Sequence, residues 1–270
     1  MSNYVVAGVD IGSTTAKALV LDENNQMWTA MIPSGTRPPQ AGQEVFQMAL
    51  EKSGHPMSDV GFTIATGYGR VSASFANKTV TEIACHGRGA HFLDPSVRTI
   101  IDIGGQDAKS ISLGDLGKVV DFLINDKCAS GTGRFLESAS QLVLHVPLED
   151  LGKLSSSAKT RVSISSTCTV FAQTELISLL AAGESIESVV AGLHAAIASK
   201  VGGMAKRLGV RPTVMMTGGV AKNTGVVQAL KRELGVDIVV PVNVDPQLVG
   251  ALGAALIARE TLQSNGGARG

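Results

Sequence analysis

The sequence predicts an α/β protein built from two related halves. The pattern Asp-Ile-Gly-x-x-x-Ala-Lys occurs twice, at residues 10–17 and again at residues 102–109. Each copy begins at the end of an apolar strand and runs directly into a second strand, which predicts a β-hairpin rather than a strand–loop–helix unit. Because the pattern and its setting are both repeated, we expect a duplicated supersecondary unit, with helices between and after the strands.

The first half is expected to contain short strands and one helical segment. Apolar residues and turn signals predict strands at residues 5–9, 18–21 and 61–66, a Pro-rich loop at 37–42 and helical spacing at 44–50. Residues 82–86 have a mixed character. We expect this half to comprise residues 1–97 together with residues 248–270, which contain a C-terminal helix.

The second half, residues 98–247, is expected to repeat this order. The same signals predict strands at residues 99–103, 110–113, 119–124, 213–217 and 237–240. Helical periodicity predicts an amphipathic helix at 185–208 and a shorter helix at 226–234, and the C-terminal helix of the first half is expected at 248–261. The polar, Gly-rich tail after residue 263 is expected to be disordered.

Composition excludes several classes of function. The 270 residues carry no formal net charge, which gives no reason to expect nucleic acid or an anionic membrane as a partner. No apolar run is expected to span a membrane, and the first residues lack the features of a signal peptide. We therefore expect a cytoplasmic protein, in which disulfides are disfavoured.

Two of the three cysteines share a distinctive setting. Cys128 stands just before the turn Gly131-Thr132-Gly133 and a helix-like run, and Cys168 also precedes a helix-like run. The start of a helix offers free backbone N–H groups, which stabilise a thiolate or an anionic cluster. One chain cannot supply the four thiolates of a typical iron–sulfur cluster from these positions, whereas two chains can. A zinc ion shared by two chains is the alternative. Cys85 lacks this setting and is interpreted as a core residue.

The repeated loops are candidates for gripping phosphates. We expect the two loops to face each other across a nucleotide cleft, with Asp10 and Asp102 holding Mg²⁺ through waters. Gln106 is expected either to orient the attacking water or to contact a phosphate. Further candidate nucleotide-binding residues are Gly12, Ser13, Thr14, Lys17, Gly104, Gly105, Gly131, Thr132, Gly133, Gly218, Gly219, Val220, Asn223 and Gln247. Neither a P-loop nor a dinucleotide-binding fingerprint is present in the sequence.

The order of these loops resembles the superfamily of actin, sugar kinases and chaperone ATPase domains. In that order, residues 10–17 are phosphate loop 1, residues 102–107 are phosphate loop 2, and residues 218–223 are the adenosine loop. The resemblance implies a duplicated actin-like, ribonuclease H-like fold with a nucleotide between its halves.

Five segments narrow the resemblance to one family. They are residues 125–135 and 166–171 around the cysteines, Thr66-Gly-Tyr-Gly-Arg70, residues 101–107 and residues 245–254. Together they look like the activator ATPases of 2-hydroxyacyl-CoA dehydratases, which are relatives of the ATPase subunits of benzoyl-CoA reductases. The resemblance covers nearly the whole chain.

This resemblance implies an ATPase that transfers single electrons. It implies a homodimer with one 4Fe–4S cluster held by Cys128 and Cys168 of each chain, ferredoxin or flavodoxin as the electron donor, and a dehydratase component as the acceptor. The alternatives are a subunit of a benzoyl-CoA reductase type complex, a small-molecule kinase and a non-enzymatic ATP sensor.

The expected coupling of ATP to the electron is mechanical. A helix dipole contributes roughly 0.3–1 kcal/mol, which corresponds to only tens of millivolts for one electron. Because that is too small to drive a difficult reduction, we hypothesise that hydrolysis changes the angle between the two cysteine helices and opens the cluster towards its acceptor.

Overall fold

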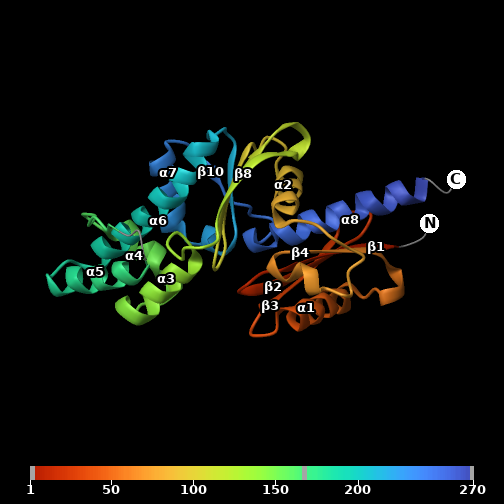
Figure 1. Ribbon diagram of the computed structural model, residues 1–270, viewed down its shortest axis with the longest axis horizontal. Helices are drawn as coiled ribbons and strands as arrows, with labels where there is room; N and C mark the ends of the chain where they lie inside the picture. The colour runs from red at the N-terminus through yellow and green to blue at the C-terminus, as the bar shows by residue number, and fades with distance from the viewer. Residues whose placement is uncertain (1–3, 166–168, 268–270) are drawn as a thin grey trace. The chain divides into compact units, whose positions relative to one another are not determined.

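The computed structural model describes residues 4–165 and 169–267, which belong to two compact units (Figure 1). Unit 1 contains residues 1–95, 114–119 and 243–270, and unit 2 contains residues 96–113 and 120–242. Each unit therefore combines segments that are distant in the sequence.

Unit 1 is a five-stranded sheet covered by helices on both faces. The strand order is β3-β2-β1-β4-β5, with β2 antiparallel to its two neighbours and β1 parallel to β4. Figure 1 shows α1 and α8 on opposite sides of these strands. The elements are β1 (Val5–Ile11), β2 (Thr15–Leu21), β3 (Met27–Pro33), α1 (Pro38–Ser53), β4 (Val60–Thr66), β5 (Lys78–Thr79), α2 (Glu82–Leu93) and α8 (Val249–Gly267).

Strand β1 is buried on both faces because its alternate side chains enter two different cores. Val5, Val9 and Ile11 join the core that includes α1, whereas Val6 joins the core that includes α8. On the α8 side, Gly8 lies so close to the helix that a Cβ would stand 2.0 Å from the carbonyl oxygen of Ala251. This close packing holds the end of β1, where Asp10 lies, against α8.

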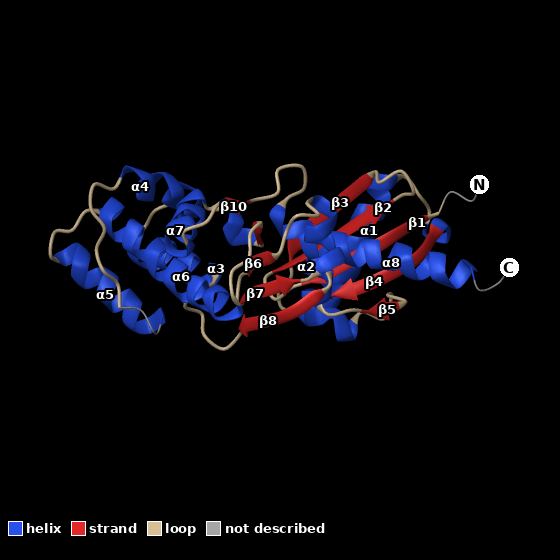
Figure 2. Cartoon of the chain, turned by 90° about the horizontal axis from the view of Figure 1, so that it is seen from above, coloured by secondary structure: helices blue, strands red, loops and turns tan. Residues whose placement is uncertain are grey.

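Unit 2 repeats the sheet of unit 1. Its strand order is β10-β9-β6-β7-β8, which matches β5-β4-β1-β2-β3 position by position. Figure 2 shows the helices of this unit beside the strands. The elements are β6 (Thr99–Ile103), β7 (Ala108–Leu113), β8 (Val119–Asn125), α3 (Gly133–Ala139), α4 (Leu151–Ser157), α5 (Thr169–Ala181), α6 (Ile186–Leu208), β9 (Val214–Thr217), α7 (Thr224–Leu234) and β10 (Ile238–Val239).

The register of the strands confirms the predicted duplication. Asp10 is paired with Lys17 across the first hairpin, and Asp102 is paired with Lys109 across the second. Each aspartate also has a threonine beside it on the adjacent parallel strand, Thr66 in unit 1 and Thr217 in unit 2. The two halves therefore share topology and register as well as a sequence motif.

Two local predictions were wrong, and residues 82–86, for which no element was predicted, form part of a helix. Residues 38–42 are not a loop, because Pro38 and Pro39 occupy the first turn of α1, where proline needs no N–H partner. Helix α8 extends through residues 264–267, part of the tail that was expected to be disordered. Residues 82–86 begin a regular helix, α2, whose N-cap Thr81 accepts a hydrogen bond from the Ala84 N–H.

Helix α6 also corrects the expectation that no apolar run is long enough to cross a membrane. Within the described residues, α6 meets that criterion by length and composition, with a mean hydropathy of 1.2. Because 72% of this window is buried within the protein, core packing accounts for its apolar character.

Candidate functional site

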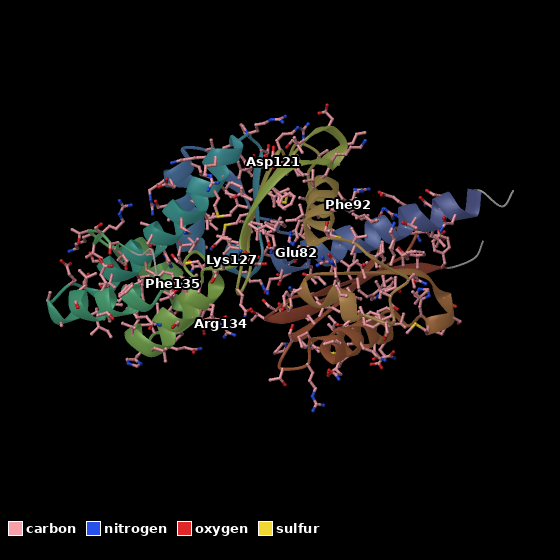
Figure 3. The ribbon with its side chains drawn as sticks, in the orientation of Figure 1. Glu82, Phe92, Asp121, Lys127, Arg134 and Phe135 are labelled. Carbon is pink, nitrogen blue, oxygen red and sulfur yellow. The ribbon has the colours of Figure 1, made fainter. Side chains whose placement is uncertain are left out.

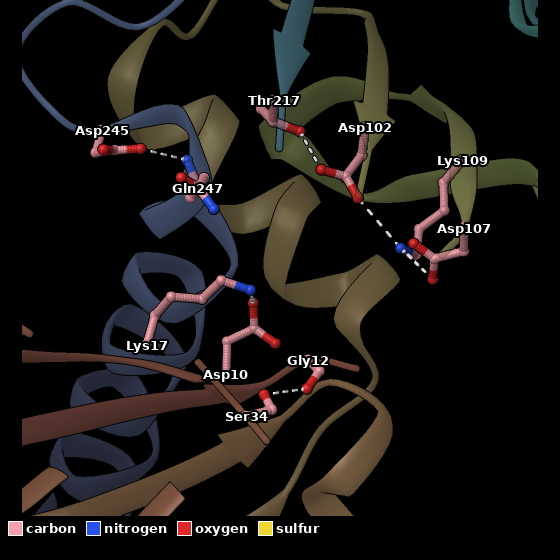
Figure 4. A network of polar contacts seen from close by, with 10 residues as sticks. All are labelled: Asp10, Gly12, Lys17, Ser34, Asp102, Asp107, Lys109, Thr217, Asp245 and Gln247. Atoms are coloured by element: carbon pink, nitrogen blue, oxygen red, sulfur yellow. Dashed lines mark hydrogen bonds and ion pairs between the residues drawn. The ribbon is translucent and has the colours of Figure 1, made fainter. Parts of the chain in front are cut away.

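Phosphate loop 1 is a tight turn at the carboxyl end of β1. The Gly12 N–H donates to the Thr15 carbonyl (3.1 Å), and the Ser34 hydroxyl donates to the Gly12 carbonyl (2.6 Å). The Lys17 ammonium lies 3.1 Å from Asp10 Oδ2 (Figure 4). Asp10 and Lys17 therefore form a nearly buried, neutral pair directly beside the loop.

Phosphate loop 2 has the same turn and one more carboxylate. The Gly104 N–H donates to the Asp107 carbonyl (3.0 Å). The Lys109 ammonium lies 3.1 Å from Asp102 and 2.8 Å from Asp107, and the Thr217 hydroxyl donates to Asp102 Oδ1 (2.9 Å) (Figure 4). These three charged side chains carry a net charge of −1, so this loop is suited to a cation such as Mg²⁺.

The carboxylates fit Mg²⁺ better through water than directly. Asp10 and Asp102 each already have a lysine ammonium at 3.1 Å, and Asp102 also accepts from Thr217. A directly bound Mg²⁺ would have to displace these partners, whereas a hydrated Mg²⁺ keeps several of its waters in most protein sites. The water-mediated role of both aspartates stays a prediction.

Phosphate loop 2 is hydrogen-bonded to the start of α3. The Gly133 N–H donates to the Gly104 carbonyl and the Arg134 N–H donates to the Gly105 carbonyl, both at 2.8 Å. Figure 3 labels Arg134 and Phe135 in this first turn and Lys127 in the segment before it. The expectation that this helix start offers free N–H groups to an anionic cluster is therefore wrong, because the carbonyls of phosphate loop 2 occupy them.

Cys128 lies in a structured turn five residues before Gly133. The Asn125 side-chain amide donates to the carbonyls of Cys128 (2.9 Å) and Ser130 (3.0 Å), and the Thr132 hydroxyl donates to the Ala129 carbonyl (2.7 Å). The cysteine is half-buried. Its predicted partner, Cys168, lies outside the described residues. Among the residues that are described, no three His, Cys, Asp or Glu side chains are grouped as in a metal site.

Cys85 is a core residue, as expected. Its side chain is completely buried in α2. Burial raises the pKa of the Cys85 thiol to about 12, and the neighbouring Thr66 hydroxyl and Arg70 guanidinium oppose that rise. A thiol with so high a pKa is a poor nucleophile and a poor metal ligand at neutral pH. His86, on the same helix, is also buried.

The adenosine loop follows β9 and opens α7. Gly218 has φ +84°, and a Cβ there would lie 2.4 Å from the Ile103 carbonyl oxygen, so this position requires glycine. Gly219 begins a short 3₁₀ turn that buries Val220. Asn223 caps α7 by accepting from the Val226 N–H (3.2 Å), and its amide nitrogen lies 3.3 Å from His194 Nε2. Asn223 therefore connects the loop to the core of unit 2.

His194 makes the stability of unit 2 depend on pH. Burial, and to a smaller degree Arg232, lowers the pKa of His194 from 6.5 to about 4. Between these values the unfolded chain binds a proton that the folded chain does not, so stability falls as the pH falls. We expect a loss of at most about 3 kcal/mol over this range. Chemical denaturation of the wild type and of His194→Gln at pH 7 and pH 4.5 measures this loss of stability. If the stability of both proteins depended equally on pH, the prediction would be contradicted.

The remaining candidate residues differ in their exposure to solvent. Gln106 is exposed and Ser13 and Gln247 are partly buried, and the Gln247 N–H donates to Asp245 Oδ1 (2.9 Å). The Thr14 hydroxyl is buried and has no hydrogen-bond partner in the described part of the chain, so it is free to donate to a ligand. The roles predicted for these residues stay predictions.

Sequence reasoning missed the importance of two threonines. Thr217 holds Asp102, and Thr66 occupies the equivalent position beside Asp10. The sequence did contain a signal for these threonines, since a Thr-Gly pair stands at the end of an apolar strand at residues 66–67 and again at residues 217–218. It shows that the duplication includes β4 and β9 as well as the two hairpins.

Comparisons with known proteins agree with this geometry. The profile of the BadF/BadG/BcrA/BcrD ATPase family matches residues 7–258. A 2-hydroxyisocaproyl-CoA dehydratase activator from Clostridioides difficile is 45% identical over 251 residues, which cover 93% of each chain. The solved structure of an activator of that dehydratase from Clostridium difficile, with bound ADPNP, has a TM-score of 0.90 at 43% identity and covers 97% of this chain and 96% of its own. One of the subunits of benzoyl-CoA reductase from Thauera aromatica is 31% identical over 261 residues, covering 93% of this chain and 92% of its own.

The family profile spans almost the whole chain, and both the sequence relatives and the structural match cover more than nine-tenths of it. The repeated sheets and the repeated loops agree with the fold of these proteins. The chain therefore belongs to the BadF/BadG/BcrA/BcrD ATPase family and has a duplicated actin-like fold.

Proposed function

We propose that this ATPase activates a 2-hydroxyacyl-CoA dehydratase by ATP-dependent transfer of single electrons. The phosphate loops and the adenosine loop bind ATP and Mg²⁺, with Asp10 and Asp102 holding the cation through waters. A homodimer shares one 4Fe–4S cluster, to which each chain contributes Cys128 and Cys168. A ferredoxin or flavodoxin supplies the electron. The similarity to the dehydratase activator supports this proposal.

The observation that carries the proposal is the link between phosphate loop 2 and α3. Two backbone hydrogen bonds join Gly104 and Gly105 to the first turn of the helix that follows Cys128. A movement of the loop on loss of the terminal phosphate must either shift this turn or break both bonds. Since Cys128 stands only five positions before Gly133, a shift of this turn would move the thiol.

The turn around Cys128 suits a ligand to a shared cluster. Its backbone is held by the Asn125 amide, so the thiol is presented from a fixed turn, and the residue is only half-buried. Cluster ligation requires thiolates, and a bound 4Fe–4S cluster would supply a one-electron carrier. Cys85 fits this role poorly, because its side chain is inside the core and its thiol is held in the protonated form.

Iron and sulfide analysis of anaerobically purified protein tests the cluster assignment. We expect about four irons per dimer in the wild type, and loss of iron with a shift towards monomer in both Cys128→Ala and Cys168→Ala. Cys85→Ala is the matched control and should retain the iron. A colourless, monomeric wild type, or iron retained in both cysteine variants, would contradict the assignment.

A component of a benzoyl-CoA reductase type complex is the second candidate, favoured by the similarity to the reductase protein from Thauera aromatica. The two functions differ in the electron acceptor. Reduced protein and ATP should support dehydration of a 2-hydroxyacyl-CoA when a dehydratase component is added. Activity only after addition of the other components of an aromatic-ring reductase would favour the second candidate instead.

A further inference from the structure

The duplication gives unit 1 its own copy of the adenosine loop. Gly67 follows β4 as Gly218 follows β9, and their backbone angles are nearly identical, φ +82° and ψ −176° against φ +84° and ψ 176°. The next hydrogen bond is also repeated, since the N–H of Arg70 donates to Gly67 and that of Ala221 donates to Gly218, both at 3.3 Å. We refer to residues 67–72 as the Arg70 loop.

Both loops pack closely against the aspartate of their own unit. A Cβ on Gly67 would lie 2.3 Å from Asp10 Oδ1, and a Cβ on Gly218 would lie 2.9 Å from Asp102 Oδ1. A Cβ on Gly69 would also lie 2.5 Å from the Ile11 side chain. The Arg70 loop is therefore part of the carboxyl end of β1, where phosphate loop 1 begins.

The Arg70 loop and the adenosine loop carry chemically different residues at equivalent positions. Val220 and Ala221 in unit 2 are apolar residues buried in the core of that unit. Their counterparts in unit 1 are Gly69 and Arg70, so a glycine and a guanidinium stand where unit 2 has two apolar core residues. Arginine is suited to phosphate because its planar fork donates two parallel hydrogen bonds.

The charge on Arg70 is available to a ligand. Its guanidinium donates to the Gly67 carbonyl (2.9 Å), and within residues 4–165 and 169–267 no carboxylate pairs with it. In contrast, Lys17 is already neutralised by Asp10. Asp10 and Arg70 act in opposite directions on the pKa of the buried Cys85 thiol, which Asp10 raises and Arg70 lowers.

We propose that Arg70 is a catalytic residue that contacts the terminal phosphate of ATP from unit 1. This inference rests on the proposed function and extends it to a residue that the phosphate loops do not contain. The Gly67 carbonyl orients the guanidinium, and the fork stabilises the negative charge that develops on the phosphate during hydrolysis. ADP lacks that phosphate, so Arg70 should distinguish the two nucleotides.

Nucleotide affinity and turnover of Arg70→Ala and Arg70→Lys test this assignment. For Arg70→Ala we expect the Kd of the non-hydrolysable ATP analogue ADPNP to rise about tenfold or more while the Kd of ADP changes less than about threefold. We expect kcat for ATP hydrolysis to fall by about 100-fold. Arg70→Lys should recover part of the analogue affinity because it keeps the charge without the fork.

The matched control is Arg88→Ala, which removes a surface arginine of unit 1 that pairs with Glu260 (2.6 Å). It should leave both affinities and kcat unchanged. A purely structural Arg70 would instead weaken ADP and the analogue equally and lower the melting temperature, and that result would overturn the assignment, as would wild-type values for Arg70→Ala. A wild-type protein that neither binds nor hydrolyses ATP would overturn the proposed function together with this inference.

Discussion

Replacing Gly253 with alanine is expected to destabilise unit 1 by about 3 kcal/mol, because overpacking against backbone cannot be relieved by a side-chain rotation. Helices α2 and α8 cross at this residue, and an added Cβ would lie 1.7 Å from the carbonyl oxygen of Cys85. The two helices would have to separate, which would also loosen the core around Leu252 and Leu256. Chemical denaturation of the purified variant measures the loss.

Gly203→Ala is the matched control for this prediction. Gly203 also lies within a helix, α6, but a Cβ there would meet nothing within 4 Å. Alanine at this position is expected to stabilise the protein by about 0.5–1 kcal/mol, since it reduces the backbone entropy lost on folding. Equal effects of the two substitutions would show that the crossing of α2 and α8 does not depend on glycine.

Replacing Lys109 with methionine is the second change with a large expected effect. Its side chain is 4% exposed and lies between Asp102, which is 5% exposed, and Asp107. Methionine leaves Asp102 as a buried charge without its cation, which typically costs about 3–5 kcal/mol. We expect a loss of stability of about that size in unit 2, and a loss of ATP hydrolysis, because phosphate loop 2 is built on this pair.

The control for Lys109→Met is Lys153→Met. Lys153 is 86% exposed and lies 3.8 Å from Asp150, and such surface pairs contribute about 0–1 kcal/mol. Adding Asp102→Asn to Lys109→Met should recover part of the lost stability, because it removes the unpaired charge. A double variant as unstable as Lys109→Met alone would assign the loss to packing rather than to charge.

The repeat of a short motif predicted more of this fold than the periodicity of any single element. Residues 10–17 and 102–109 form equivalent hairpins, and the strand orders of the two sheets match. Boundaries were harder to predict, as at Pro38, because a proline in the first turn of a helix has the same local pattern as a proline in a loop. Short segments such as β5 and α4 carried no sequence signal strong enough to be predicted.

The candidate site was likewise predicted only in part from the sequence. Asp10, Asp102 and Cys128 were proposed as site residues from motifs, because residue type and spacing indicate their chemistry. The hydrogen bonds from Gly133 and Arg134 to phosphate loop 2 could not be predicted, since backbone N–H groups look alike in every sequence. The place of Arg70 was equally hidden, although the Thr-Gly pair that precedes it was visible twice.

The sequence by itself determined the duplication, the two aspartate–lysine hairpins and the family to which the chain belongs, because each depends on residue identity at short range. Only the tertiary structure decided that the start of α3 is used by phosphate loop 2 and that a second copy of the adenosine loop presents Arg70. These contacts join segments about 30–60 residues apart in the chain, and they form because buried backbone groups must find partners wherever the packed sheets place them.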